Sequence, residues 1–190
     1  MATYHILNGD CLADQLRQTK ISQDYIVCRE CLIDGDLYAD NIADFWTIRA
    51  KFIADIYTVS IEEYFNRTVK EFEKLKISSR MKFVWLKLNK YLNSNEFELY
   101  EIKLNTTTYQ EFVRLTTHPY QIGEGEAATI AIVTTVNGYT ASNNFKDIQQ
   151  FIETGYIDNK TTIDILCEAY VSNIKTLQEL ENLRVDMKNN

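Results

Sequence analysis

A strand, a short helix and a second strand at the start of the chain constrain the fold most. Residues 4–8 form a short apolar strand that stops at Gly9 and Asp10, residues 11–18 have helical character, and residues 25–33 have the pattern of a second strand. Strand, helix and strand in this order begin an α/β unit. The 190 residues include 6 Gly and 1 Pro, so most of the chain is expected in helices and strands.

The remaining pattern continues this alternation. Ser60 and Glu63 have the spacing of a capping box, which predicts a helix start there. Residues 78–80 are a short polar segment, and they indicate a boundary between two parts of the chain. The expected helices are 42–57, 60–77, 82–93, a helix from Thr107 or Thr108 that ends before Pro119, 127–136, 145–153, 161–170 and 176–187, and the expected strands are 96–104 and 139–142.

Charge and hydropathy narrow the class of protein. The net charge of -7, from 27 acidic and 20 basic residues, argues against broad nonspecific binding to nucleic acid, which requires a basic surface. It is compatible with a nuclease whose metal ions supply the positive charge. No stretch reaches the ~18 consecutive apolar residues of a membrane span, and the first 12 residues lack a signal-peptide pattern. We therefore expect a cytoplasmic protein that does not contact a membrane.

Polar residues follow the first strand, at the place where open α/β sheets bind ligands. Asn8, Gly9 and Asp10 stand there. The Asp10 carboxylate is suited to holding a metal ion or a hydroxyl group, and capping of the next helix is an equally good interpretation.

Two later sets of acidic and amide side chains have the same two interpretations, a ligand site or local capping. Glu124 and Glu126 precede an Ala-rich helix, and Asn143, Asn144 and Asp147 follow the strand at 139–142. Each group alone is typical of helix starts and turns. Together they favour a ligand site, because consecutive α/β units bring their strand ends to one edge of a sheet.

Cys28 and Cys31 have the spacing of half a zinc site or of a redox pair. The sequence has no second Cys or His pair at ligand spacing. The motif also falls within an expected strand, where residues three apart point to opposite faces, whereas redox motifs of this type sit at a helix start. Ordinary thiols in a sheet are therefore the favoured interpretation.

Three ordered motifs resemble the C-terminal part of PIN-like nuclease domains, and the resemblance covers about residues 96–187. The motifs are G-E-G-E-A-A-T-I-A at 123–131, A-S-N-N-F-K-D-I at 141–148 and T-T-I-D-I-L-C-E-A at 161–169. The resemblance implies a Rossmann-like α/β/α sandwich with a mainly parallel sheet. It further implies acidic residues at the C-terminal edge of that sheet, which hold Mg²⁺ or Mn²⁺ for the hydrolysis of RNA.

The N-terminal part resembles a bacterial domain family of unknown function, also Rossmann-like, through three other motifs. They are H-I-L-N-G-D-C-L at 5–12, C-R-E-C-L-I-D-G at 28–35 and F-W-T-I-R-A at 45–50. The chain thus divides into a piece at 1–78 and a PIN-like piece at 79–190. PIN-like domains open with a strand that carries an aspartate, and the second piece has none, so we expect Asp10 to supply it in one composite domain.

The PIN-like resemblance assigns the site residues. It implies that Glu126 and Asp147 hold the divalent ion together with Asp10, the first acid of the composite hypothesis, and with Asn144 as a further ligand. PIN-like domains also carry an acid on a helix just before the matched region, and Glu73 is the nearest candidate for this further ligand. Asn144 stands near a position where many relatives carry an aspartate. RNA is the implied substrate, and a cognate antitoxin, as in toxin–antitoxin systems, is an implied partner.

The alternative expectation is an inactive Rossmann-like module that binds a nucleotide, nucleic acid or a protein. Its polar residues would be Asn8, Asp10, Arg29, Glu30 and Arg49. The helix at 176–187 also carries an apolar stripe. Such a stripe packs on its own domain or on a partner subunit, which would make the protein a homo-oligomer.

Overall fold

Parallel strand pairing organises the computed structural model, which describes residues 3–12, 25–33, 37, 42–52, 55–75 and 80–189. Within these residues the strands form a five-stranded parallel sheet in the order β3-β2-β1-β4-β5. The strands are β1 (Tyr4–Leu7), β2 (Tyr25–Cys28), β3 (Phe97–Tyr100), β4 (Gly138–Ala141) and β5 (Asn159–Lys160).

The order of the strands reverses at β1. The chain runs outward from β1 to β2 and β3, and then returns to the other side of β1 for β4 and β5. Leu7 is paired with Val27 of β2 and with Ala141 of β4. Strands from before and after residues 78–80 therefore share one sheet. The reversal between β1 and β4 is the place where open α/β sheets form a ligand crevice.

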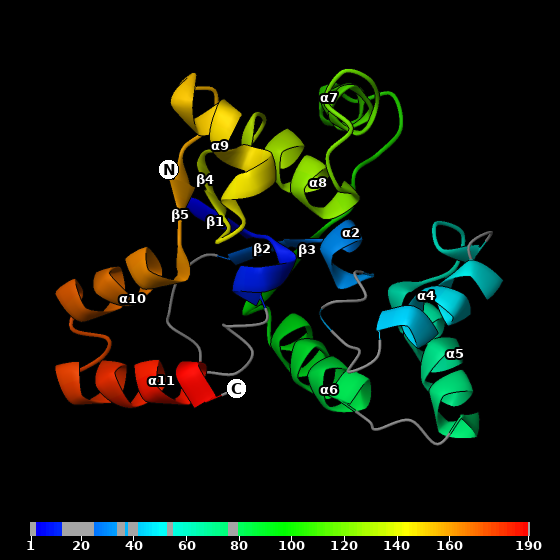
Figure 1. Ribbon diagram of the computed structural model, residues 1–190, viewed down its shortest axis with the longest axis horizontal. Helices are drawn as coiled ribbons and strands as arrows, with labels where there is room; N and C mark the ends of the chain where they lie inside the picture. The colour runs from blue at the N-terminus through cyan, green and yellow to red at the C-terminus, as the bar shows by residue number, and fades with distance from the viewer. Residues whose placement is uncertain are drawn as a thin grey trace.

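Helices cover both faces of the sheet, as Figure 1 shows. Helices α7, α8 and α9 lie on one face, and α6, α10 and α11 lie on the other, with α4 and α5 beyond α6. The fold is a Rossmann-like α/β/α sandwich, as the sequence predicts. The helices are α2 (Arg29–Leu32), α4 (Ile42–Lys51), α5 (Ile61–Lys74), α6 (Arg80–Asn93), α7 (Thr107–Thr116), α8 (Glu124–Val133), α9 (Phe145–Glu153), α10 (Thr162–Val171) and α11 (Leu177–Asn189).

Alternate residues of the central strands enter two separate cores. Ile6 and Ile26 pack with Ala128 and Ile132 of α8 on one face. The other face, which includes Leu7, contributes to a larger core with helices α5, α6 and α10. Burial of both faces explains why β1 and β2 are almost continuously apolar. None of the helices in the described residues is both long enough and apolar enough to cross a membrane.

Capping side chains fix several helix starts that the sequence predicts. The Ser60 hydroxyl accepts a hydrogen bond from the backbone N–H of Glu63 at 3.1 Å. Thr161 and Asp164 form a reciprocal capping box at the start of α10. The cap of α7 is Thr106, one or two residues earlier than predicted, because its hydroxyl accepts from the backbone N–H of Tyr109.

The predicted strand at 25–33 is wrong in its second half, because residues 29–32 form α2. These residues are all buried, so their pattern shows neither a period of two nor one of 3.6, and a buried apolar run does not separate strand from helix. The predicted strand at 96–104 ends at Tyr100, and the short strand β5 was not predicted. Residues 9–12 are helical, and the rest of the helix predicted at 11–18 lies outside the described residues.

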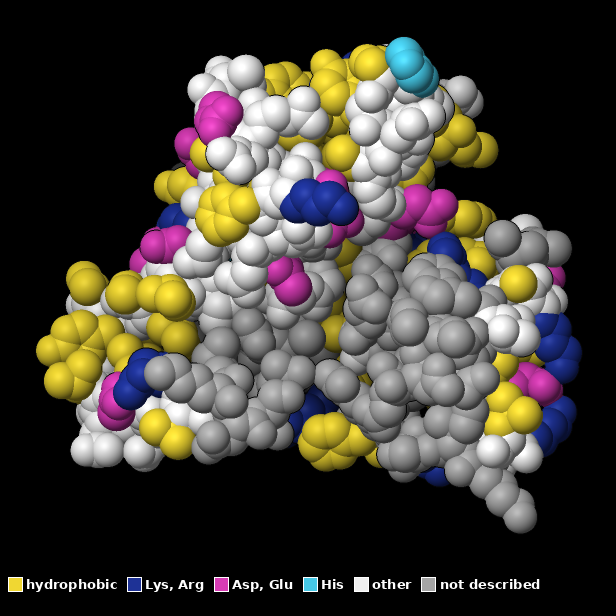
Figure 2. Space-filling model, viewed as in Figure 1, with side chains coloured by type: hydrophobic (Ala, Val, Ile, Leu, Met, Phe, Trp, Pro, Cys, Tyr) yellow, Lys and Arg dark blue, Asp and Glu magenta, His cyan; other side chains and the backbone are white. Residues whose placement is uncertain are grey.

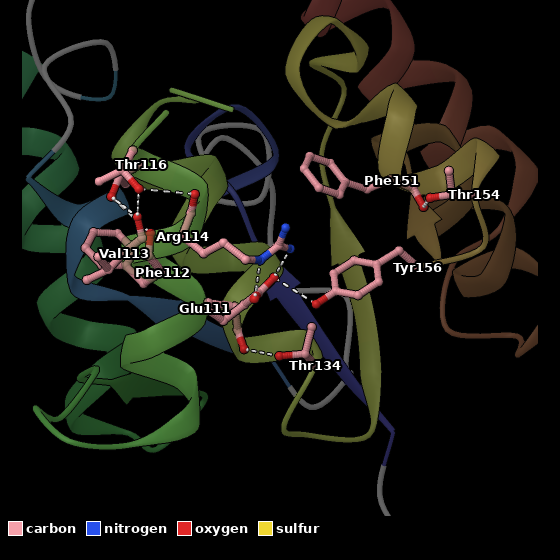
Figure 3. Close-up of polar contacts among 11 residues, drawn as sticks. Glu111, Phe112, Val113, Arg114, Thr116, Thr134, Phe151, Thr154 and Tyr156 are labelled. Carbon is pink, nitrogen blue, oxygen red and sulfur yellow. Dashed lines mark hydrogen bonds and ion pairs between the residues drawn. The ribbon is translucent and has the colours of Figure 1, made fainter. Parts of the chain in front are cut away.

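An ion-pair network fixes α7 against the turn that follows α9 (Figure 3). Arg114 donates two hydrogen bonds to the Glu111 carboxylate, at 2.7 and 2.5 Å, and the Tyr156 hydroxyl donates to the same carboxylate at 2.8 Å. These hydrogen bonds, Arg114 first, lower the pKa of Glu111. The Arg114 guanidinium also lies 4.7 Å from the centre of the Tyr120 ring. The network joins α7 to the turn after α9, within the same layer of helices.

Apolar side chains are exposed over α10 and α11, and Figure 2 shows them gathered on this side of the molecule. The apolar stripe predicted at 176–187 is divided. Leu180 and Leu183 pack against the larger core, whereas Leu177 and Val185 are exposed.

Candidate functional site

Polar side chains from three elements meet where the strand order reverses. The Oε1 atom of Glu126, in the first turn of α8, accepts hydrogen bonds from Asn8 Nδ2 at 3.2 Å and from Asn144 Nδ2 at 2.9 Å. Asn8 follows β1, and Asn144 is the N-cap of α9. Ser142, directly after β4, has its hydroxyl oxygen 3.3 Å from Asn8 Nδ2. We call Asn8, Glu126, Ser142 and Asn144 the switch-point cluster.

The start of α8 positions the Glu126 carboxylate. A carboxylate in the first turn of a helix is favoured by the helix dipole. The side chain folds back over Gly123, where an added Cβ would lie 2.7 Å from Glu126 Oε2. The glycine therefore leaves the space that the carboxylate occupies, and the two amides fix one of its oxygens.

Asp10 joins the end of β1 to the loop after β4. Its Oδ1 atom accepts from the backbone N–H of Cys11 at 2.7 Å, and its Oδ2 atom accepts from that of Asn143 at 2.6 Å. Asn143 in turn exchanges two hydrogen bonds with Thr162 at the start of α10, both at 3.0 Å. The carboxylate thus stands beside the switch-point cluster, in the short helical segment at 9–12, and it ties this segment to the loop after β4.

The other predicted residues differ in their position. Asp147 lies half-buried in the first turn of α9, the helix that Asn144 caps. Glu73 is exposed on α5 and forms an ion pair with Lys82 at 3.3 Å. Helices α5 and α9 lie on opposite sides of the sheet (Figure 1). The edge where the strand order reverses therefore includes Asp10, Glu126, Asn144 and the start of α9, and Glu73 lies away from it.

The side-chain atoms at this edge that could ligate a metal ion are oxygen atoms. Among the described residues, no group of three or more His, Cys, Asp or Glu side chains is placed to hold a metal ion. Two carboxylates, of Asp10 and Glu126, stand beside amide and hydroxyl groups. Mg²⁺ is commonly bound in proteins by one or two carboxylates together with water and substrate phosphates. The chemistry of the donors therefore suits a hard divalent ion with few protein ligands.

A second polar group lies at the ends of β2 and β3. Glu30, in α2, is 6% exposed, and its Oε2 atom has no hydrogen-bond partner among the described residues. Burial raises the pKa of Glu30 to about 7; the nearby Arg29 opposes this effect, and the charges of Glu124 and Glu101 add to it. Arg49 forms an ion pair with Glu124 at 3.1 Å.

Arg29 holds this second group to the rest of the molecule. Its guanidinium forms an ion pair with Glu101 at 3.0 Å and donates to the backbone carbonyls of Val59, at 2.9 Å, and Ile56. Arg29, Glu30 and Arg49 belong to the polar set expected of a binding module. Their grouping could not be predicted from the sequence, because it depends on α2 replacing the second half of a predicted strand.

The prediction that Cys28 and Cys31 are strand thiols on opposite faces is wrong. It depended on the strand predicted at 25–33, whose second half is helix α2. Cys28 ends β2 and is the N-cap of α2, and Cys31 lies within α2. One helical turn brings the two Sγ atoms to 3.0 Å from each other. The signal in the sequence was the Cys-x-x-Cys spacing itself.

Comparison with known proteins gives no family for this chain: no protein-family model matches it, and no curated protein matches it.

Proposed function

We propose that the protein is a PIN-like, divalent-metal-dependent endoribonuclease with its site at the switch-point cluster and Asp10. One observation carries the proposal: Glu126 is hydrogen-bonded both to Asn8, after β1, and to Asn144, after β4. Glu126 and Asn144 belong to the motifs that resemble PIN-like domains, and Asn8 stands two residues before Asp10, the acid that the composite hypothesis adds. The parallel sheet order with β1 between β2 and β4 supports the same assignment.

The proposed roles follow from the contacts of each side chain. Glu126 and Asp10 would hold Mg²⁺ or Mn²⁺ directly, and Asp147, in α9, would reach the ion through its water ligands. The bound ion supplies positive charge at the phosphate and lowers the pKa of a bound water. Asn8 and Asn144 orient the Glu126 carboxylate through its Oε1 atom, which leaves Oε2 for another contact.

The test is cleavage of a fluorescent RNA by the full chain in Mn²⁺ and in EDTA. We expect cleavage only in Mn²⁺. Glu126→Gln and Asp10→Asn, which each remove a ligand charge, should lose at least about 100-fold, and Asp147→Asn, which acts through the water ligands, should lose about 10-fold. Glu153→Gln, an exposed change at the end of α9, is the matched control and should cleave normally. Equal activity in EDTA, or in Glu126→Gln, would contradict the proposal.

One observation favours a second candidate, the inactive Rossmann-like module. Two amides already satisfy Glu126 Oε1, and the described residues gather no group of three metal-ligating side chains. Such a module would bind a nucleotide, nucleic acid or a protein, such as an antitoxin or a second copy of the chain. Folded protein that binds RNA but does not cleave it in Mn²⁺ would support this candidate.

A further inference from the structure

The chain holds a pair of thiols that the proposed function does not use. Cys28 and Cys31 are fully buried beside the sheet, and their Sγ atoms are 3.0 Å apart. A disulfide has an S–S bond of about 2.0 Å, so the two atoms need to approach by only about 1 Å. The strand-to-helix turn at Cys28 creates this proximity, since residues three apart on a helix share a face.

We propose that Cys28 and Cys31 are a redox-active pair that closes to an intramolecular disulfide by exchange with a small-molecule disulfide. The spacing and the position at a helix start are those of thiol–disulfide redox motifs. Formation of this disulfide does not depend on the proposed ribonuclease activity.

The exchange proceeds in two balanced steps. The thiolate of one cysteine attacks the small disulfide, forms a mixed disulfide and releases one thiol. The thiolate of the other cysteine then attacks the mixed disulfide, which closes the Cys28–Cys31 bond and releases a second thiol. The two cysteines are oxidised, the small disulfide is reduced to two thiols, and these take the two protons. Because the pair is buried, local opening of the four-residue helix α2 admits the reagent.

Cys31 connects this pair to the switch-point cluster. Its Sγ atom lies 3.5 Å from Asn8 Oδ1, and 3.7 Å from both the Gly125 carbonyl and the Thr129 hydroxyl. The other end of the Asn8 amide donates to Glu126. Disulfide formation removes the Cys31 thiol proton, which Asn8 Oδ1, the Gly125 carbonyl and the Thr129 hydroxyl can each accept, so the redox state of the pair changes the polar surroundings of the residue that orients Glu126.

The experiment equilibrates the full chain in glutathione buffers from fully reduced to fully oxidised, and then alkylates the denatured protein. Reduced protein should take four alkyl groups, one for each cysteine. Oxidised protein should lose two of these sites, and the peptide that spans 28–31 should be lighter by two hydrogen atoms. Cys11 should remain alkylated, and Cys167, which is exposed, should be alkylated or carry one glutathione. Alkylation of both Cys28 and Cys31 at every buffer ratio would overturn the proposal.

Two variants separate this pair from general thiol oxidation. Cys167→Ser removes the exposed thiol and should still form the 28–31 disulfide. Cys31→Ser should leave Cys28 as a free thiol or as a mixed disulfide with glutathione. If Cys31→Ser does not fold, the peptide masses of the wild-type chain still decide. None of these measurements uses RNA, so their failure is distinct from a failure of the proposed ribonuclease.

Discussion

Glu30 is the residue whose ionisation the fold changes most clearly toward neutral pH. Burial raises its pKa from 4.5 to about 7, so the folded state binds a proton more tightly than the unfolded state. The folded state favours the protonated Glu30 carboxyl, so this preference stabilises the protein fully below pH 4.5. The stabilisation is lost as the pH rises through about 7, because the buried carboxyl must then carry a charge.

Glu30→Gln should therefore remove this pH dependence. At pH 8 the variant should be more stable than the wild type by up to about 3 kcal/mol, because it no longer buries a charge. Urea unfolding at pH 5 and pH 8 measures the difference. Glu98→Gln, an exposed change on β3, is the control. Identical pH profiles for Glu30→Gln and the wild type would contradict the burial argument.

At the residue scale, the sequence predicted which side chains stand at strand ends but not their contacts. Polar residues after apolar strands predict Asp10 and Asn144, an acidic start of an Ala-rich helix predicts Glu126, and all three lie at the reversal of the strand order. Glu73 is the predicted acid on the helix before the matched region, and it lies on α5, away from the cluster. The sequence places Glu30 only in the polar set of the binding module. Its burial beside Arg29 was not predictable, because residues 25–33 are predicted as a strand.

Gly138 decides whether β4 can approach β1. An added Cβ would lie 2.4 Å from the Tyr4 carbonyl oxygen and 2.7 Å from Ile6 Cδ1. The backbone of β1 cannot move away without breaking the pairing of Tyr4 with Gly138.

Gly138→Ala should therefore destabilise the protein by about 2 kcal/mol, the usual cost of overpacking. Chemical denaturation provides the measurement. The control is Gly155→Asn, where φ is +68° and no atom lies within 4 Å of the added Cβ, and where Asn tolerates the left-handed backbone. A denaturation midpoint of Gly138→Ala at or above that of the wild type would show that β1 and β4 accommodate the added methyl group.

Elements with several turns or a capping signal were the predictable ones. The helices that start after Ser60 and Thr161 combine apolar periodicity with a cap, and both are present. Helix α2 has four residues and β5 has two, so neither is long enough to show a period. Tertiary contacts, such as those of Arg29 with Glu101 and Val59, therefore decide the conformation after β2.

The whole molecule depends on β1 and β2, which lie in the first third of the chain and at the centre of the sheet. A fragment of residues 79–190 retains β3, β4 and β5, but β3 and β4 each lose the neighbouring strand that joins them to one sheet. We expect this fragment to be unfolded by circular dichroism, whereas the full chain unfolds cooperatively. Cooperative unfolding of the fragment would instead indicate two independent domains.

The alternation of strands and helices predicted the α/β class at this scale. The order of the strands was beyond local patterns, because it depends on which strands pair across about 130 residues of sequence, as Tyr4 and Gly138 do. The composite hypothesis requires Asp10 to lie near Glu126 and Asp147. The strand pairing of β1 with β4 is the observation that bears on it.

If Asp10 and Glu126 hold one divalent ion, Mn²⁺ must stabilise the folded state, and thermal unfolding in Mn²⁺ measures this stabilisation. A ligand that binds only the folded state stabilises it by about 2.7 kcal/mol at 100 times its Kd, which for a chain of this size raises Tm by roughly 2–4 °C per kcal/mol. We predict that Mn²⁺ raises the Tm of the wild type and of Glu153→Gln, and does not raise it in Glu126→Gln or Asp10→Asn. An equal rise in Glu126→Gln, or none in the wild type, would contradict the account.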